Sequence, residues 1–189
     1  YKALHPQTGN HVALRLLNQQ VMQGADEFDM WVSAGQTAAD LNHPNLQRIL
    51  SMGSESGRAY LVLEFIEGKS LRQRLLDQKR LPALEALEIM IQVGEALAYG
   101  HSRDLIHGDL RPTHILIGLD GRVRLSGLGT PKQVLKDLQL MAEKSGGIPL
   151  YSPPEVLLDE GESDERSDIY SLGAIGYHMI TGNPPHEGA

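Results

Sequence analysis

The chain has 189 residues, enough for one domain with a sizeable core or for two small lobes. Its formal net charge of −7 argues against nucleic acid or an anionic membrane as the main partner, and the absence of cysteine excludes disulfides and thiolate chemistry. No apolar run approaches the roughly 20 residues that a membrane helix needs, so we expect a cytoplasmic segment without membrane contact.

The first 66 residues have the pattern of a strand-rich region with one helix. Turn residues separate the first two strand-like runs, at His5-Pro6-Gln7-Thr8-Gly9-Asn10. Apolar side chains at helical spacing predict the helix, and Pro44 ends it because proline disfavours a helical conformation at the residue before it. The expected strands are Tyr1–Leu4, Val12–Leu17, Leu46–Met52 and Arg58–Phe65, and the expected helix is Phe28–Leu41.

After a short joint at Glu67-Gly68-Lys69 the chain becomes mainly helical. The expected helices are Leu71–Lys79, Pro82–Ser102 and Asp168–Thr181, and a mobile loop is expected at Thr130–Gly147. Pro82 fits the first turn of the second helix, whose inward stripe is expected to be Leu84, Leu87, Ile91, Gly94 and Leu97. The last helix is apolar on nearly every side, which predicts a buried central helix.

A short hairpin lies between these helices. The apolar runs Ile115–Ile117 and Val123–Leu125 are joined by Gly118-Leu119-Asp120-Gly121, whose Asp-Gly pair is typical of a tight turn. One polar loop precedes the hairpin and a glycine-rich loop follows it. Strands first and helices later predict an α+β fold with a boundary near Glu67, and two lobes that meet there would place a ligand site against the hairpin.

The two loops that flank this hairpin resemble those of protein kinases. His107-Gly108-Asp109-Leu110-Arg111-Pro112-Thr113-His114 is similar to the motif H-R-D-L-x-x-x-N, and Ser126-Gly127-Leu128-Gly129 is similar to the segment that contains D-F-G. Further segments match kinase motifs in the right order, and the residues of these motifs are most similar to those of bacterial serine/threonine kinases of eukaryotic type. These segments are Val12-Ala13-Leu14-Arg15, His43-Pro44-Asn45, Tyr60–Gly68, Tyr151-Ser152-Pro153-Pro154-Glu155 and Ser167-Asp168-Ile169-Tyr170-Ser171-Leu172-Gly173.

The resemblance implies a protein-kinase-like, two-lobed α+β fold that is truncated at both ends. Residues 1–66 would form the N-lobe, an antiparallel sheet with helix C that lacks the first strand and the Gly-rich phosphate loop. Residues 67–189 would form a mainly helical C-lobe that ends after helix F. In that fold Asp168 would hold the backbone of the catalytic loop, and an apolar stack through both lobes would contain Ala38, Ile49, His107 and Leu128.

The resemblance also assigns site residues. Asp109 stands at the position of the catalytic base, and Arg111 replaces a lysine that contacts phosphate. The nucleotide-binding positions fall on Ala13, Arg15, Leu63, Glu64, Ile66 and Leu116. Ala13 and Leu116 would enclose adenine, backbone groups of Glu64–Ile66 would bond it, and Arg15 would replace the phosphate-binding lysine. By residue type alone, Asp109 also fits a turn-capping aspartate and Arg15 a half-exposed strand residue.

Several charged positions of the kinase motifs are replaced. Gly127 stands at the metal-binding aspartate, His114 at the asparagine that binds the second magnesium, and Ala34 at the helix C glutamate. Mg²⁺ prefers hard oxygen ligands, which glycine lacks and neutral imidazole does not supply. Gly108 replaces the arginine that contacts a phosphorylated activation loop. We therefore expect no metal site, a hydrogen-bonded role for His114 and the loss of phosphate transfer.

These departures favour a pseudokinase, a binding and regulatory module of phosphorylation signalling. Its partner would be a protein: an active kinase, a substrate or other domains of its own chain. No cofactor is expected beyond weak ATP binding without magnesium. Two alternatives stay open: a weakly active serine/threonine kinase that transfers the ATP γ-phosphate, and a nucleotide-binding switch that works without metal.

Overall fold

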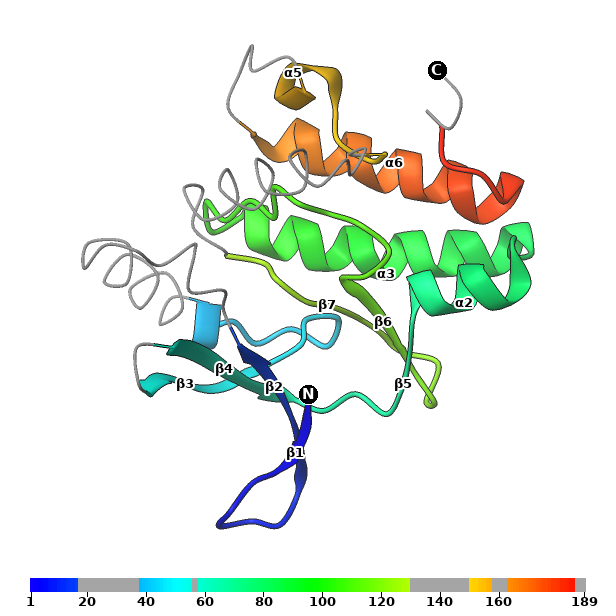
Figure 1. The fold of residues 1–189 in the computed structure, drawn as a ribbon. Coiled ribbons are helices and arrows are strands. Elements are labelled where there is room, and N and C mark those ends of the chain that lie inside the picture. The colour runs from blue at the N-terminus through cyan, green and yellow to red at the C-terminus, as the bar shows by residue number, and fades with distance from the viewer. Residues whose placement is uncertain (17–37, 56–57, 130–149, 158–162, 186–189) are drawn as a thin grey trace.

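The structure is a computed structural model that describes residues 1–16, 38–55, 58–129, 150–157 and 163–185 (Figure 1). The loop expected at Thr130–Gly147 and the helix C position at Ala34 lie outside these residues, as does most of the helix expected at Phe28–Leu41. Within the described ranges, no helix is both long enough and apolar enough to span a bilayer.

An antiparallel four-stranded sheet forms the N-terminal part, with the strands β1 (Lys2–Leu4), β2 (His11–Leu16), β3 (Ile49–Glu55) and β4 (Arg58–Glu64) in the order β1-β2-β4-β3. Gly9 in the turn after β1 has a φ of 67°, a conformation that glycine adopts without steric cost. Ala13 lies opposite Leu63 of β4, which in turn lies opposite Ile49 of β3. These three side chains therefore share one face of the sheet.

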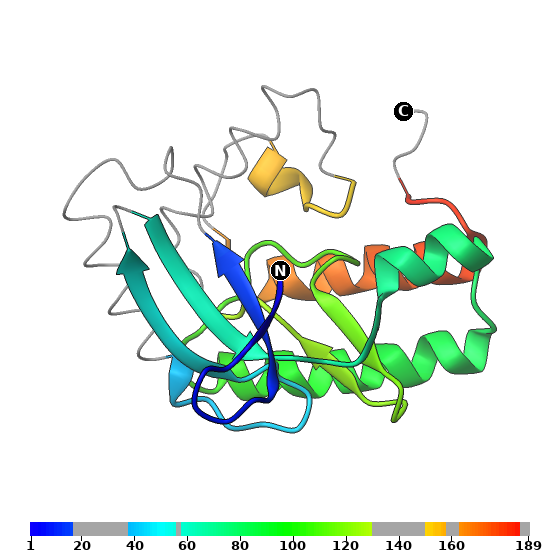
Figure 2. The ribbon, with the colours of Figure 1, turned by 60° about the horizontal axis from the view of Figure 1, so that its bottom comes forward.

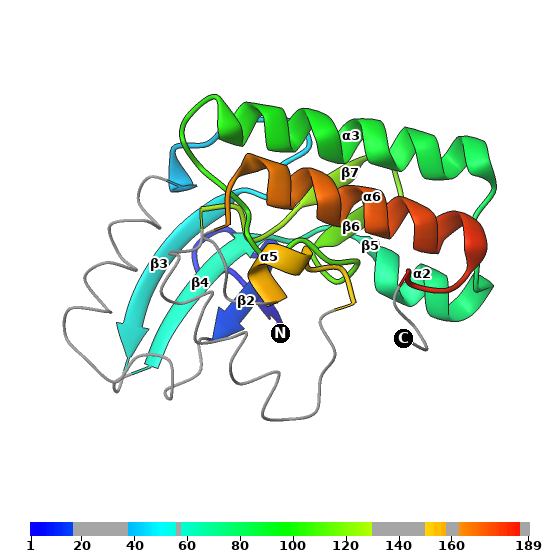
Figure 3. The same cartoon turned by 90° about the horizontal axis from the view of Figure 1, so that it is seen from above.

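A three-stranded sheet and a layer of helices form the C-terminal part. The strands are β5 (Gly68–Ser70), β6 (Ile115–Gly118) and β7 (Val123–Leu125), in the order β5-β6-β7, and the described helices are α2 (Leu71–Gln78), α3 (Ala83–His101), α5 (Pro154–Leu157) and α6 (Glu165–Thr181). Helices α3 and α6 lie side by side above the small sheet (Figures 1 and 3). The four-stranded sheet lies beside this helical layer, which gives the two lobes that the sequence predicted (Figure 2).

Local sequence sets where these helices begin and end. The Ser70 hydroxyl accepts a hydrogen bond from the backbone of Gln73, and the Gln73 side chain accepts one from the backbone of Ser70, so a capping box starts α2. The Asp164 carboxylate caps α6 by accepting from the Ser167 N–H, and Gly182 ends that helix in the left-handed conformation.

The core is centred on α3, the β6–β7 hairpin and α6. Its largest fully buried side chains include Leu71, Leu97, Ile115, Leu125, Ile175 and Met179. Each such side chain stabilises the fold by about 1.5–3 kcal/mol relative to exposure. The two long helices approach closely at Gly176, where a Cβ would lie 2.6 Å from the sulfur of Met90.

The expected inward stripe of α3 is wrong at Leu84, Leu87 and Ile91, whose exposed fractions are 69%, 53% and 52%. The buried face instead carries Ala86, Ile89, Val93, Ala96, Leu97 and Gly100. Because α3 is apolar on two sides, helical spacing fits either of them. The side with the alanines and the glycine packs inward because small residues let neighbouring elements approach more closely.

The prediction of a buried central helix is correct for one side of α6. Leu172, Ile175 and Met179 are buried, whereas Ile169 and Tyr177 have exposed fractions of 56% and 52%. The buried side packs on α3, which covers one face of a helix that is apolar on nearly every side. Apolar composition alone therefore overestimated the burial of this helix.

Two segments connect the lobes. The first is covalent and runs from β4 to β5 through residues 65–67. The second is residues 45–47, which lie beside β7: the N–H of Gln47 donates to the carbonyl of Leu125 at 2.9 Å, and the N–H of Leu125 donates to the carbonyl of Asn45 at 2.8 Å. The four-stranded sheet is thus anchored to the small sheet by a second segment, which also contacts Glu64 at the start of the covalent connection.

Candidate functional site

Asp168 holds the loop that precedes the central hairpin. Its carboxylate accepts hydrogen bonds from the backbone N–H of His107 and of Gly108, both at 2.9 Å, and from Nε2 of His101 at 2.8 Å. Only 1% of Asp168 is exposed. The expectation that this residue ties down the loop backbone is therefore confirmed.

His107 connects this loop to the glycine-rich loop after β7. Its Nε2–H donates to the carbonyl of Ser126 at 3.0 Å, while its Nδ1 accepts from the N–H of Asp109 at 3.3 Å. A ring with one donor and one acceptor nitrogen is neutral. Burial lowers the pKa of His107, against the opposing effect of Asp168, which agrees with the neutral form.

Asp109 lies in the loop before the hairpin, and Arg111 binds its carboxylate. Nε of Arg111 donates to one carboxylate oxygen at 2.7 Å and Nη2 donates to the other at 2.5 Å. The exposed fraction of the Asp109 side chain is 12%, and that of Arg111 is 40%. A bidentate pair of this kind neutralises the carboxylate and uses both of its oxygens as acceptors.

His114 lies at the end of the same loop, directly before β6. Its Nδ1–H donates to the backbone carbonyl of Asp109 at 2.8 Å, and its ring lies 5.3 Å from that of His107 between centroids. Burial, together with the nearby His107 and Arg15, lowers the pKa of His114 to about 4, against the effect of Asp109. The expectation of a hydrogen-bonded, neutral loop histidine is confirmed.

Gly127 lies close to both His107 and Arg15. Gly127 has a φ of 95°, and a Cβ built on it would lie 3.5 Å from Nε2 of His107 and 3.9 Å from Nη1 of Arg15. Arg15 as a whole is exposed, but the surroundings of its guanidinium are crowded enough that burial lowers its pKa, while Asp109 acts to raise it. A cationic group therefore lies beside the glycine.

The expected base-binding positions lie at the junction of the lobes. Ala13 and Leu63 share a face of the four-stranded sheet, and Glu64 is the last residue of β4. Ile66 lies in the covalent connection, and Leu116 lies in β6 of the other lobe. The structure thus places these residues on both sides of the connection, as the sequence implied.

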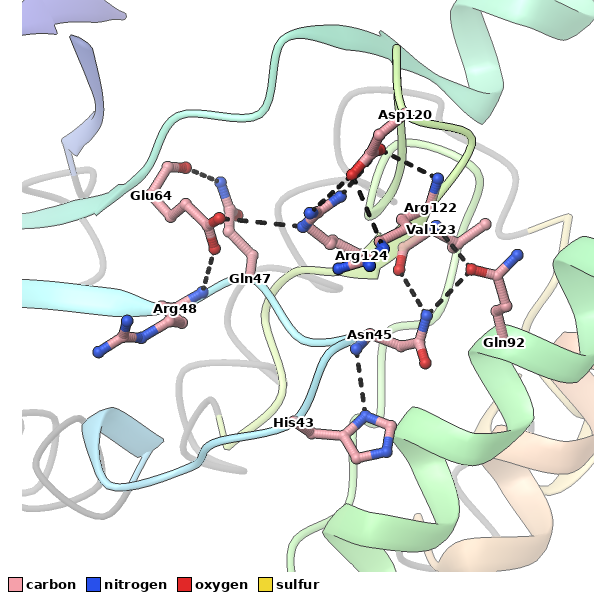
Figure 4. Close-up of polar contacts among 10 residues, drawn as sticks. All are labelled: His43, Asn45, Gln47, Arg48, Glu64, Gln92, Asp120, Arg122, Val123 and Arg124. Carbon is pink, nitrogen blue, oxygen red and sulfur yellow. Dashed lines mark hydrogen bonds and ion pairs between the residues drawn. The ribbon is translucent and has the colours of Figure 1, made fainter. Parts of the chain in front are cut away.

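The sequence did not indicate the polar residues that surround Glu64 (Figure 4). Nε2 of Gln47 donates to the Glu64 carbonyl at 2.8 Å, and Nε of Arg124 lies 3.9 Å from a Glu64 carboxylate oxygen. Arg124 also binds Asp120 at 3.1 Å. Along β7 the polar Arg124 stands between the apolar Val123 and Leu125, so strand alternation could have placed its side chain on the opposite face, next to Leu116 of β6. Nothing in the sequence indicates the contact between Gln47 and Glu64.

Comparison with known proteins gives the family. The model of the protein kinase domain matches residues 1–189. The chain belongs to the protein kinase family. The kinase domain is 30% identical to the serine/threonine-protein kinase PknA of Mycobacterium tuberculosis, over 100% of this chain and 44% of PknA, and 31% identical to sperm motility kinase 2B of Mus musculus, over 99% of this chain and 37% of that kinase.

A solved structure supports the same fold. The crystal structure of a mutant PknI kinase domain of Mycobacterium tuberculosis is similar with a TM-score of 0.78 and 26% sequence identity, covering 98% of this chain and 69% of that one. The predicted kinase-like α+β fold is confirmed. The chain spans less than half the length of these two curated relatives.

The family implies a magnesium site, and the residues at the two family positions for its ligands do not fit one. Gly127, at the position of the metal-binding aspartate, has no side-chain oxygen. Nδ1 of His114 is used by a backbone carbonyl. In the part of the chain that the structure describes, no three histidine, aspartate or glutamate side chains gather closely enough to hold an ion.

Proposed function

We propose that this kinase domain is a pseudokinase, which transfers no phosphate and acts in phosphorylation signalling by binding a protein. The observation that carries the proposal is the glycine at position 127, where the family has its metal-binding aspartate, because glycine has no side-chain oxygen to offer a metal. At the base position, Arg111 donates to both carboxylate oxygens of Asp109, so a substrate hydroxyl would have to share or displace this pair.

The size of the expected loss follows from the role of metal in phosphate transfer. Metal ions stabilise the charge of the transferring phosphate by several kcal/mol, and each ~1.4 kcal/mol changes the rate tenfold. Arg15 near Gly127 supplies positive charge, but a guanidinium does not bridge phosphate oxygens in octahedral geometry as Mg²⁺ does. Transfer is therefore expected to fall by several orders of magnitude.

The contrast within the C-lobe supports binding as the function. Asp168 and His107 keep the loop backbone in place, so the kinase fold holds this loop although Gly127 and His114 replace the family's metal ligands. We propose a protein partner in the cytoplasm, either an active kinase, a substrate of one, or another domain of the same chain. The net charge of −7 makes nucleic acid an unfavourable partner.

Arg15 favours a second candidate function, a nucleotide-binding switch that needs no metal. Its Nη1 lies 3.9 Å from the Cβ position of Gly127, so cationic charge stands close to where a metal-binding carboxylate would otherwise be. A phosphate group could be neutralised in part by this guanidinium. ATP binding of this kind would be weak and insensitive to magnesium.

Phosphate transfer tests the proposal directly. The full-length protein is incubated with labelled ATP and magnesium, with a generic substrate, and in parallel as Asp109→Asn. We expect incorporation at background in both proteins. Incorporation above background that disappears in Asp109→Asn would establish a weakly active serine/threonine kinase instead.

A nucleotide titration separates the two binding functions. Thermal unfolding is followed with ATP in the presence of magnesium and of a chelator. No shift in either condition supports a domain that binds protein alone, and equal shifts support the metal-independent switch. A shift that requires magnesium contradicts both and favours the enzyme.

A further inference from the structure

Helix α3 carries a row of large apolar side chains on its outer side. We call Leu84, Leu87 and Ile91 the outer stripe, and each of these three residues is more than half exposed. Their spacing of three and four residues places them on one face of the helix, over about two turns. The helix lies along the edge of the helical layer, beside α6 (Figure 3). The outer stripe is therefore one continuous apolar surface and not a set of scattered side chains.

The fold does not use the outer stripe for its own core. The opposite side of α3 is buried and includes the small residues Ala86, Ala96 and Gly100. Three large apolar side chains thus remain in water, without the stabilisation that their burial would bring. The outer stripe is available to a partner that can cover it.

Acidic side chains border the outer stripe. Residues 83–101 contain three glutamates and neither lysine nor arginine. Glu85 pairs with Arg74 of α2. Glu88 and Glu95 are exposed, and no cationic side chain of the described residues pairs with either of them. Each of these two glutamates follows a member of the stripe by four residues, so uncompensated negative charge stands beside the apolar surface.

We propose that the outer stripe binds an amphipathic helix of a partner protein, in which lysine or arginine flanks the apolar residues. Apolar side chains at helical spacing fit the apolar face of another helix, and the flanking glutamates favour a basic partner over an acidic one. A second copy of this chain is disfavoured, because two copies joined by the same surface bring their glutamates together. This inference rests on the proposed function, since it names the surface through which the domain would bind its protein partner.

Two labelled peptides test the charge preference on the full-length protein. Both are amphipathic helices of about 20 residues with leucine at alternating third and fourth positions. One peptide has lysine beside the leucines, and the other has glutamate there. Binding is followed by fluorescence anisotropy, with the labelled peptide at a concentration too low for it to pair with itself. We expect the Kd of the lysine peptide to be lower by about tenfold or more.

Leu87→Gln tests whether the peptide binds at the outer stripe. It removes an apolar side chain from the centre of the contact, so the Kd of the lysine peptide should rise about tenfold. Leu76→Gln is the matched control, because Leu76 is 71% exposed but lies on α2, outside the stripe. This control should leave the Kd unchanged. If Leu87→Gln fails to fold, as judged by circular dichroism, Ile91→Gln takes its place with the same expected result.

Glu88→Lys combined with Glu95→Lys tests the role of charge. The double variant should reverse the preference, so that the glutamate peptide binds more tightly than the lysine peptide. The protein keeps a net negative charge after both substitutions, so a general attraction of cationic peptides cannot produce this reversal.

The other outcomes overturn the proposal. Binding of neither peptide up to about 1 mM does so, as does an equal effect of Leu87→Gln and Leu76→Gln, or a preference that the double charge reversal leaves unchanged. A dimer of the native protein that Leu87→Gln dissociates in analytical ultracentrifugation would assign the outer stripe to a second copy instead. None of these measurements involves phosphate transfer, so failure of this proposal and failure of the proposed pseudokinase function are distinguishable.

Discussion

Asp168 and Asp109 are two aspartates of one lobe that the protein uses in opposite ways. Asp168 accepts hydrogen bonds from backbone groups of a different element, far away in the sequence. Asp109 accepts from Arg111, which is two residues away in the same loop and partly exposed. The first aspartate joins distant parts of the chain by hydrogen bonds, whereas the side-chain hydrogen bonds of the second stay within its own loop.

The difference shows on which of the two carboxylates the stability of the fold depends. A buried carboxylate that bonds loop amides cannot be removed without leaving those amides unpaired. A carboxylate bound by its neighbour can be removed, and the arginine then returns to solvent. The fold therefore retains the first kind and is indifferent to the second.

The largest expected effect is that of Asp168→Ala. The substitution leaves the N–H groups of His107 and Gly108 unpaired in the core, and the loss of a buried, hydrogen-bonded charge costs on the order of 3–5 kcal/mol. Urea unfolding should show this loss or a failure to fold. A variant as stable as the native protein would show that the fold does not depend on the hydrogen bonds of Asp168.

The pH dependence of stability should come next in size. The pKa of His114 is lowered to about 4 in the folded protein, below its ordinary value of about 6.5, so the unfolded chain takes up the proton first as the pH falls. Stability is then complete above pH 6.5 and decreases by on the order of 2–3 kcal/mol down to pH 4. His107 acts in the same direction.

The contribution of His114 can be isolated with His114→Asn. Unfolding midpoints of the native protein and the variant are compared at a series of pH values from 7 to 4. The variant should lose less stability over this range, and His107 remains in both proteins as the internal control. Parallel curves would show that the pKa of His114 in the folded protein is not lowered.

The smallest expected effect is that of Asp109→Ala. Because Arg111 is 40% exposed, screening by water leaves this pair worth under about 1 kcal/mol. Thermal unfolding should therefore shift by a few degrees at most, and Arg111→Ala should behave alike. A loss of stability equal to that of Asp168→Ala would mean that Asp109, like Asp168, holds the loop backbone in place.

Much of this arrangement was predictable because its signals are local. The Asp120-Gly121 turn and the short apolar runs beside it predicted the hairpin, and the order of motifs predicted which loops flank it. Asp168 at the start of an apolar helix indicated a buried anchor, which the structure contains.

The errors come from choices that packing makes. Leu84, Leu87 and Ile91 satisfy helical spacing as well as the buried face does, and sequence periodicity cannot say which side meets α6. The contact of Gln47 with Glu64 joins two residues that the fold alone brings together. Both depend on the arrangement of elements and not on any residue's own preference.

The segment of residues 45–47 beside β7 has a consequence for how the domain opens. The N–H of Gln47 donates to the carbonyl of Leu125, the carbonyl of Asn45 accepts from the Leu125 N–H, and Nδ2 of Asn45 donates to the carbonyl of Val123 at 2.9 Å. These residues precede a strand of the N-terminal sheet, yet they belong energetically to the other lobe. In native-state hydrogen exchange the amide of Gln47 should open together with the hairpin and not with β3 and β4, so the boundary between cooperative units lies inside the N-terminal half of the chain.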